Sequence, residues 1–96
     1  MRIRWTQLAL SDLEAIREYV SRDKAAASTR LAGRLRTAVE RLTAHPASGR
    51  RVPGFEQRGF REVIVKPYRI VYSVHGREVR ILRVWHGRRD LGGVDS

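Results

Sequence analysis

The sequence predicts an α+β domain in which a pair of helices covers one face of a mostly antiparallel sheet. Apolar side chains recur at helical spacing through residues 7–44, and they alternate with polar ones, as in strands, through residues 60–86. A short alternating segment at residues 1–5 precedes both. The expected order is therefore β-α-α-β-β-β, with the helices grouped together and most strands grouped after them.

The first strand and the first helix follow from two different spacings. Residues 1–5 place Ile3 and Trp5 on one side, as in a half-buried strand. Either Thr6 or Ser11 can cap the helix that follows, so its first turn stays open. Apolar residues recur at i, i+4, i+7 and i+11, and a stripe with this spacing faces a core. Its members are Ala9, Leu13, Ile16 and Val20. The solvent side is expected to hold Asp12, Glu14, Arg17 and Glu18.

A second helix is expected after a short break at residues 21–24. It ends near Ala44, because Pro46 cannot continue a helix. Its apolar stripe repeats the same spacing in Leu31, Leu35, Ala38 and Leu42. A basic ridge on another face consists of Arg30, Arg34 and Arg41. The two helices of residues 7–44 therefore form an antiparallel hairpin, since neither can bury its stripe alone.

Three further strands make an antiparallel meander over residues 60–86. The strands are expected at residues 60–65, 68–74 and 79–85, with a tight turn at Lys66-Pro67, and residues 87–96 form a tail. The helix hairpin is expected to cover one face of this sheet and to leave the other face open. The predicted core includes Leu13, Ile16, Val20, Leu31, Leu35, Leu42 and Tyr72.

The net charge is the strongest feature of the composition. A chain of 96 residues fits one domain, residues 1–96, with 20 Lys and Arg against 10 Asp and Glu and a net charge of +10. Such a surface attracts nucleic acid, ribosomes or an acidic protein segment. Only Lys24 and Lys66 are lysines, however, and a GC-rich genome would give the same excess of arginine without a function.

Several classes of site are excluded by the residues the chain lacks. Cysteine is absent, which excludes disulfides and cysteine metal sites. His45, His75 and His86 lack the spacing of metal ligands, so neither a metal nor a cofactor is expected. No apolar run approaches the roughly 20 residues of a membrane span, and the first residues do not read as a signal peptide. We therefore expect a cytoplasmic protein without a membrane partner.

Glycine-rich phosphate loops and nucleophile elbows are absent from the sequence. Ser73 is expected to be an ordinary sheet residue. The remaining candidates are cationic and aromatic: Arg61, Arg69, Arg83, His86, Arg88 and Arg89, with Tyr68, Tyr72 and Trp85. Arginines can clamp phosphates, and His86 could move a proton during RNA cleavage. The alternative is a solvated sheet face with Tyr72 and Trp85 in the core.

Five segments, in the same order along the chain, match a known family. They are Trp5-Thr6 with Ala9 and Asp12-Leu13-x-x-Ile16-x-x-Tyr19-Val20, the connection His45-Pro46 with Gly49-Arg50, and the strand segments Phe60-Arg61-Glu62, Tyr68-Arg69-Ile70-Val71-Tyr72 and Ile81-Leu82-Arg83-Val84-Trp85-His86-Gly87-Arg88-Arg89-Asp90. On these segments, between residues 1 and 91, the chain resembles ParE-type toxins of the RelE/ParE superfamily. The resemblance implies the RelE/ParE-like β-α-α-β-β-β fold and a toxin of a type II toxin-antitoxin system.

The superfamily has two branches with different targets. RelE-like members are ribosome-dependent endoribonucleases that cut mRNA, whereas ParE-like members poison DNA gyrase. The nucleases carry several basic residues before the turn and a late tyrosine, but this chain offers only Arg61 there and no late tyrosine. Its ending, His86-x-x-Arg89-Asp90, resembles the ParE branch. We therefore expect a gyrase inhibitor that is not an enzyme. The alternative is an mRNA endoribonuclease, and a plain nucleic-acid-binding module is a weaker third reading.

The resemblance also implies partners and site residues. The partner is a ParD-like antitoxin, whose acidic, partly disordered segment folds onto the toxin in a hetero-oligomer. Its contacts are expected at Leu13, Ile16, Tyr19, Val20, Arg61 and Arg69. The contacts with gyrase are expected at Arg83, His86, Arg88 and Arg89. If the chain is a ribonuclease, the catalytic residues are expected to be Arg61, Arg69, His86 and Arg88.

Overall fold

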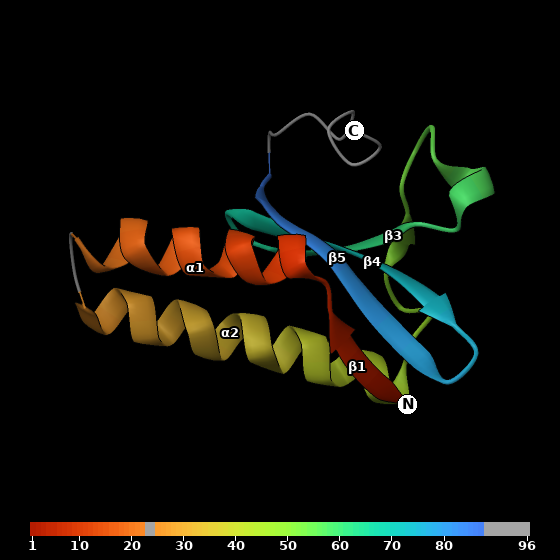
Figure 1. Ribbon diagram of the computed structural model, residues 1–96, viewed down its shortest axis with the longest axis horizontal. Helices are drawn as coiled ribbons and strands as arrows, with labels where there is room; N and C mark the ends of the chain where they lie inside the picture. Colours follow the sequence, from red (N-terminus) through yellow and green to blue (C-terminus); the bar gives the residue numbers. More distant parts are fainter. Residues whose placement is uncertain (23–24, 88–96) are drawn as a thin grey trace.

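Two helices and five strands form the part of the chain that the computed structural model describes, residues 1–22 and 25–87 (Figure 1). The elements in chain order are β1 (Arg2–Trp5), α1 (Gln7–Ser21), α2 (Ala25–Ala44), β2 (Arg50–Arg51), a short 3₁₀ turn η1 (Glu56–Arg58), β3 (Arg61–Val65), β4 (Tyr68–His75) and β5 (Glu78–His86). The predicted α+β class and the order of its elements are confirmed, with one strand more than the sequence indicated.

The five strands form one mixed sheet in the order β1-β5-β4-β3-β2. β1 runs parallel to β5, with Arg2 opposite Glu78, and the other pairs are antiparallel. The unexpected strand, β2, pairs only Arg50 with Glu62 and Arg51 with Arg61. So short a strand leaves no alternation to recognise in the sequence.

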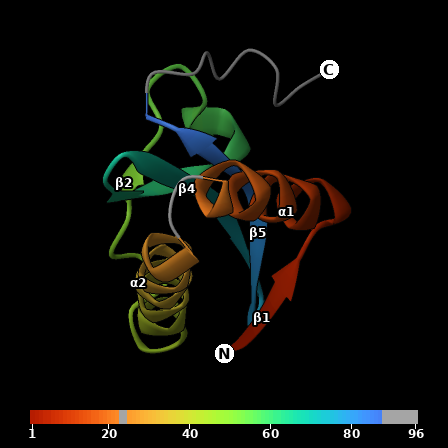
Figure 2. The ribbon, with the colours of Figure 1, turned by 90° about the vertical axis from the view of Figure 1, so that its left-hand side faces the viewer.

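α1 and α2 lie side by side on one face of the sheet, as the two perpendicular views show (Figures 1 and 2). α1 begins after Thr6, whose Oγ1 accepts a hydrogen bond from the Ala9 amide at 3.2 Å. The same hydroxyl donates to the Leu82 carbonyl at 3.1 Å. Thr6 therefore caps the helix and fastens it to β5, which decides between the two caps that the sequence allowed.

The core between the helices and the sheet contains most of the predicted residues. Those that are buried as expected are Leu31, Leu35, Leu42 and Tyr72. Leu13, Ile16 and Val20 pack against this core but are only partly buried. Val39, which was not predicted, is 4% exposed, because it continues the stripe of Leu35 on α2.

The second face of the sheet, opposite the helices, is covered in part, so the expectation of an open face is wrong. Val52, Phe60 and Val71 form a small buried cluster there, with Phe55 and Leu82 packed against it. The Phe55 and Phe60 rings stack at 5.9 Å, and the Val52 amide donates to the Phe60 carbonyl. The segment between β2 and β3 therefore folds over the sheet, because its three apolar residues need cover.

Tyr72 ties the connection between α2 and β2 to the sheet. Its hydroxyl accepts a hydrogen bond from the Gly49 amide at 2.9 Å and donates to the Pro46 carbonyl at 2.7 Å. Burial raises the pKa of Tyr72, although the Gly49 amide acts in the opposite direction. A Cβ atom on Gly49 would lie 2.6 Å from the Tyr72 hydroxyl, so this close approach requires glycine.

Candidate functional site

The free edge of β5 is closed by α1 beyond the point where β1 ends. β1 stops at Trp5, which lies opposite Ile81. The Thr6 amide then donates to the Ile81 carbonyl, and the Asp12 carboxylate accepts a hydrogen bond from the Val84 amide at 2.9 Å. The helix thus satisfies backbone groups of β5 that a longer β1 would have paired.

Asp12 also binds Arg83 through two parallel hydrogen bonds. Nε and Nη2 of Arg83 lie 2.8 and 2.9 Å from the two carboxylate oxygens, and the side chains are 15% and 12% exposed. The hydrogen bonding that Arg83 donates to Asp12 raises the pKa of Arg83, and the guanidinium carbon lies over the Trp85 ring, 4.6 Å from its centre. Assigning Asp12 to the solvent side was wrong, because this side of α1 meets the edge of β5.

A second ion network joins β2, β3 and β4, away from the pair of Asp12 and Arg83. The Glu62 side chain is 0% exposed, and its Oε1 lies 2.8 Å from Arg50 Nε. The other oxygen, Oε2, lies 3.1 Å from Arg69 Nη1, and Arg69 Nη2 donates to the Gly87 carbonyl. Arg69 is therefore held between a buried carboxylate and the chain after β5.

Arg61 and Arg69 lie on opposite faces of the sheet. In the pairing of β3 with β4, Arg61 is opposite Tyr72 while Arg69 is opposite Ile64, and side chains alternate along a strand. Arg61 donates to the Gly49 carbonyl at 2.8 Å on the helix-facing side. The structure therefore does not bring these two arginines together at one ligand.

His86 is exposed on the helix-facing side at the end of β5. It lies opposite Tyr68, and the two rings meet edge to face with centres 5.9 Å apart. Burial raises the pKa of Tyr68. Of the other predicted target contacts, Arg83 is bound to Asp12, and Arg88 and Arg89 lie outside the described residues.

Two grooves flank α1. One, of about 590 Å³, lies between α1 and α2 and includes Leu10 and Leu13. The other, of about 420 Å³, lies between α1 and the ends of β4 and β5 and includes Ile16, Tyr19 and His86. Leu10 is 46% exposed and Tyr19 67% exposed, which is unusual for large apolar and aromatic side chains. Three of the predicted antitoxin contacts thus line grooves, whereas Val20 packs at the margin of the core.

Within residues 1–22 and 25–87, no three histidine or acidic side chains lie close enough together to hold a metal ion. In the same part of the chain, neither helix has the length and apolar character needed to cross a membrane.

Sequence reasoning missed two acidic residues on which the site depends. Glu62 follows Phe60 at strand spacing and precedes Ile64, so an acid on this side of β3 could have indicated a buried ion pair. Asp12 gave a similar indication, because its neighbours at helical spacing, Leu8, Ala9, Ala15 and Ile16, are all apolar. The position of Asp12 depends on where β1 ends.

Taken together, these features define a small, basic α+β protein with exposed apolar grooves along its first helix. The chain belongs to the family described as the ParE toxin of the type II toxin-antitoxin system, parDE, which it matches over residues 3–91. The family that the sequence resemblance indicated is thus confirmed.

Individual relatives agree with this assignment. Y4kP of Sinorhizobium fredii is 41% identical over 90 residues, which cover 92% of this chain and 90% of that protein. Toxin RelE2 of Caulobacter vibrioides is 41% identical over 86 residues, which cover 88% of this chain and 93% of that toxin. A solved structure, the chromosomal ParDE system from P. aeruginosa, matches with a TM-score of 0.71 and 28% identity, and the match covers 90% of this chain and 95% of that one.

Proposed function

We propose that this toxin arrests growth by binding and poisoning DNA gyrase in the cytoplasm, and that a ParD-like antitoxin neutralises it. The observation that carries the choice of gyrase is the placement of Arg61 and Arg69 on opposite faces of the sheet. A ribonuclease needs its phosphate clamp and its proton donor at the same phosphate. Arg69 is instead engaged by Glu62, on the face away from His86.

The alternative is a RelE-like, ribosome-dependent mRNA endoribonuclease. One relative carries the name RelE2, and the exposed His86 beside Tyr68 supports this reading. An imidazole is the side chain that most often transfers protons in catalysis, and it could supply the proton transfer here. Arg61 lies four residues away from this position along β4, opposite Tyr72, and its guanidinium is bonded to backbone carbonyls.

The proposed gyrase contact is the end of β5 and the residues that follow. His86 is exposed there, and Arg88 and Arg89 come next in the sequence. Arg83 would act indirectly, because its pair with Asp12 fixes the course of β5.

The proposed antitoxin site is α1 with its two grooves. An acidic segment would approach a chain of net charge +10 quickly. An amphipathic partner helix could then place apolar side chains against Leu10 and Leu13, or against Ile16 and Tyr19. Arg61 would contribute through the positive charge it adds to the surface, since its hydrogen bonds are made to backbone carbonyls within the chain. Arg69, which is 15% exposed and paired with Glu62, would contribute by holding the sheet in place. The likeness to the ParDE system from P. aeruginosa supports a partner of this kind.

The target is tested on the purified toxin with two assays. We expect inhibition of gyrase supercoiling with trapped cleavage complexes, and no cleavage of mRNA on programmed ribosomes. His86→Ala is expected to weaken the gyrase effect. Ribosome-dependent cleavage that His86→Ala abolishes, with gyrase unaffected, would overturn the proposal in favour of the endoribonuclease.

The antitoxin site is tested by expression in cells. The toxin alone is expected to arrest growth, and co-expression of the adjacent gene to relieve the arrest. Tyr19→Glu should remain toxic but escape relief, because it places a charge in an apolar groove. Val74→Glu, at a position 37% exposed and remote from both grooves, is the matched control and should still be relieved. Equal relief of both variants would contradict the proposed site, and harmless expression of folded wild-type protein would contradict the toxin activity.

A further inference from the structure

A row of cations runs along α2 on the side of the helix that faces away from α1. Arg30, Arg34 and Arg41 are spaced i, i+4 and i+11, so they share one face. At 1.5 Å per residue, they lie about 6 Å and about 10.5 Å apart along the helix axis. With Lys66, from the turn between β3 and β4, they border a groove of about 780 Å³. The three arginines are the basic ridge.

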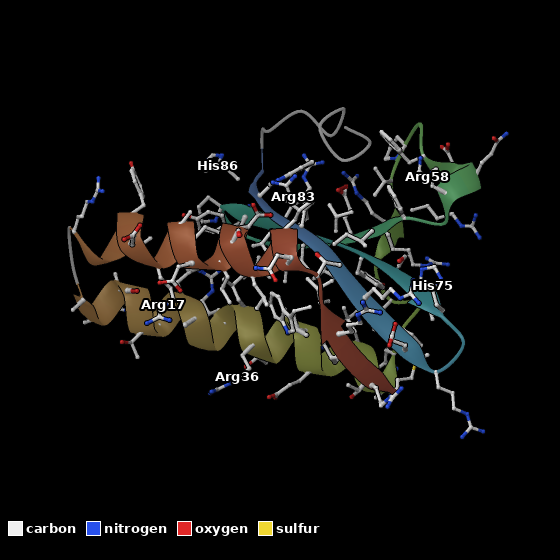
Figure 3. The ribbon with its side chains drawn as sticks, in the orientation of Figure 1. Arg17, Arg36, Arg58, His75, Arg83 and His86 are labelled. Carbon is white, nitrogen blue, oxygen red and sulfur yellow. The ribbon has the colours of Figure 1, made fainter. Side chains whose placement is uncertain are left out.

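The groove beside the basic ridge contains no acidic residue. Its walls are the ridge and Arg36, and its floor includes Ile64, which is 49% exposed. Arg36 lies 3.9 Å from Glu40, and Figure 3 shows it directed away from the sheet. It also borders the groove between α1 and α2, so it marks the boundary between the two surfaces.

The side chains of the basic ridge make no ion pair or hydrogen bond with any residue that the structure describes. Some other surface arginines do have acidic neighbours: Arg4 lies 4.0 Å from Glu78, and Arg17 lies 3.8 Å from Glu14. Like charges one helical turn apart destabilise a helix by a few tenths of a kcal/mol. Arg30 and Arg34 therefore weaken α2 slightly, and no acidic side chain among the described residues pairs with them to offset this cost. An external anion bound to the ridge would offset this cost.

We propose that the basic ridge docks the phosphate backbone of duplex DNA. Each nucleotide of a strand rises about 3.4 Å along the duplex axis, so for a helix that lies along this axis the arginine spacings correspond to about two and three nucleotides. Arginine binds phosphate oxygens through paired hydrogen bonds. Neither α2 nor the groove contains an aromatic residue, and single-stranded nucleic acid is usually held by stacking on aromatic rings. The choice of DNA over RNA rests on the proposed function, since gyrase holds duplex DNA.

The test measures, by fluorescence anisotropy, the binding of a short labelled DNA duplex to the purified toxin in the absence of gyrase. Three phosphate contacts predict a slope of about −2.7 for log affinity against log salt, which is a loss of about 40-fold between 50 and 200 mM salt. The triple variant Arg30→Glu, Arg34→Glu, Arg41→Glu should lose at least tenfold in affinity. Its circular dichroism spectrum should remain that of the wild type.

The matched control reverses three other exposed arginines, Arg2→Glu, Arg51→Glu and Arg77→Glu, which have no ion pair among the described residues. It carries the same change in net charge and should bind DNA much more tightly than the ridge variant. Equal losses in both variants would overturn the proposal, because net charge alone would then explain binding. So would equal or tighter binding of a duplex RNA, or displacement of DNA by poly-glutamate at equal charge.

The outcome is separable from that of the proposed function. If DNA binding depends on the ridge but the toxin leaves gyrase active, gyrase is not the target. The proposed role of the ridge in DNA binding would then stand. Gyrase inhibition with no ridge-dependent binding of DNA would contradict the ridge alone.

Discussion

Replacing Glu62 by alanine is expected to lower the free energy of unfolding by about 3 to 5 kcal/mol. The Glu62 side chain is fully buried between Arg50 and Arg69, and Arg69 is only 15% exposed. Removing the carboxylate leaves the Arg69 guanidinium charged, largely out of water and without its partner. A buried charge in that state is far less stable than the same charge in the unfolded chain.

Urea denaturation of the Glu62→Ala variant measures this change. Glu40→Ala is the matched control, because Glu40 forms an exposed pair with Arg36, in which the side chains are 69% and 77% exposed. An exposed pair contributes about 1 kcal/mol or less. If the two variants differed from the wild type by the same small amount, the network around Glu62 would not be a stabilising feature of the fold.

Replacing Leu35 by alanine is expected to lower the free energy of unfolding by about 2 to 5 kcal/mol. Leu35 is 2% exposed and lies at the centre of the core between α2 and the sheet. The smaller side chain loses apolar contacts and leaves a cavity that the surrounding residues fill only in part. For a small domain this is a large share of the total stability.

Thermal and urea denaturation of the Leu35→Ala variant check this expectation. Leu8→Ala makes the same chemical change on α1, at a side chain that is 53% exposed, and should stay within about 0.5 kcal/mol of the wild type. An unchanged melting curve for Leu35→Ala would show that α2 does not pack as described.

Much of the fold follows from local spacing in the sequence. The stripe through Leu31, Leu35 and Leu42 fixes which side of α2 is buried, and the alternation in β4 fixes the side of Tyr72. These patterns depend only on the geometry of a single element. They are therefore readable without knowing which other elements lie nearby.

The parts that could not be predicted depend on how elements meet. Val71 lies opposite Arg83 and Tyr72 opposite Ile81, so Leu82 is an extra residue that shifts the register of β5. The alternation of β5 changes phase at Leu82 and Arg83, but the sequence alone does not show which residue is left unpaired. The separation of Arg61 from Arg69 likewise depends on the register of β3 with β4, whereas family membership could be inferred from ordered segments alone.

The parallel pairing of β1 with β5 has a consequence for synthesis of the toxin. β1 leaves the ribosome well before β5, yet Arg2 pairs with Glu78 and Trp5 pairs with Ile81. Contacts between distant parts of a chain form late. A nascent chain can fold its helix pair early, but its sheet stays incomplete until residues 78–86 emerge. A message that is cut or abandoned before those codons therefore yields a fragment without β5, the strand that joins β1 to β4. Such a fragment cannot complete the sheet, so it leaves the cell with no working toxin.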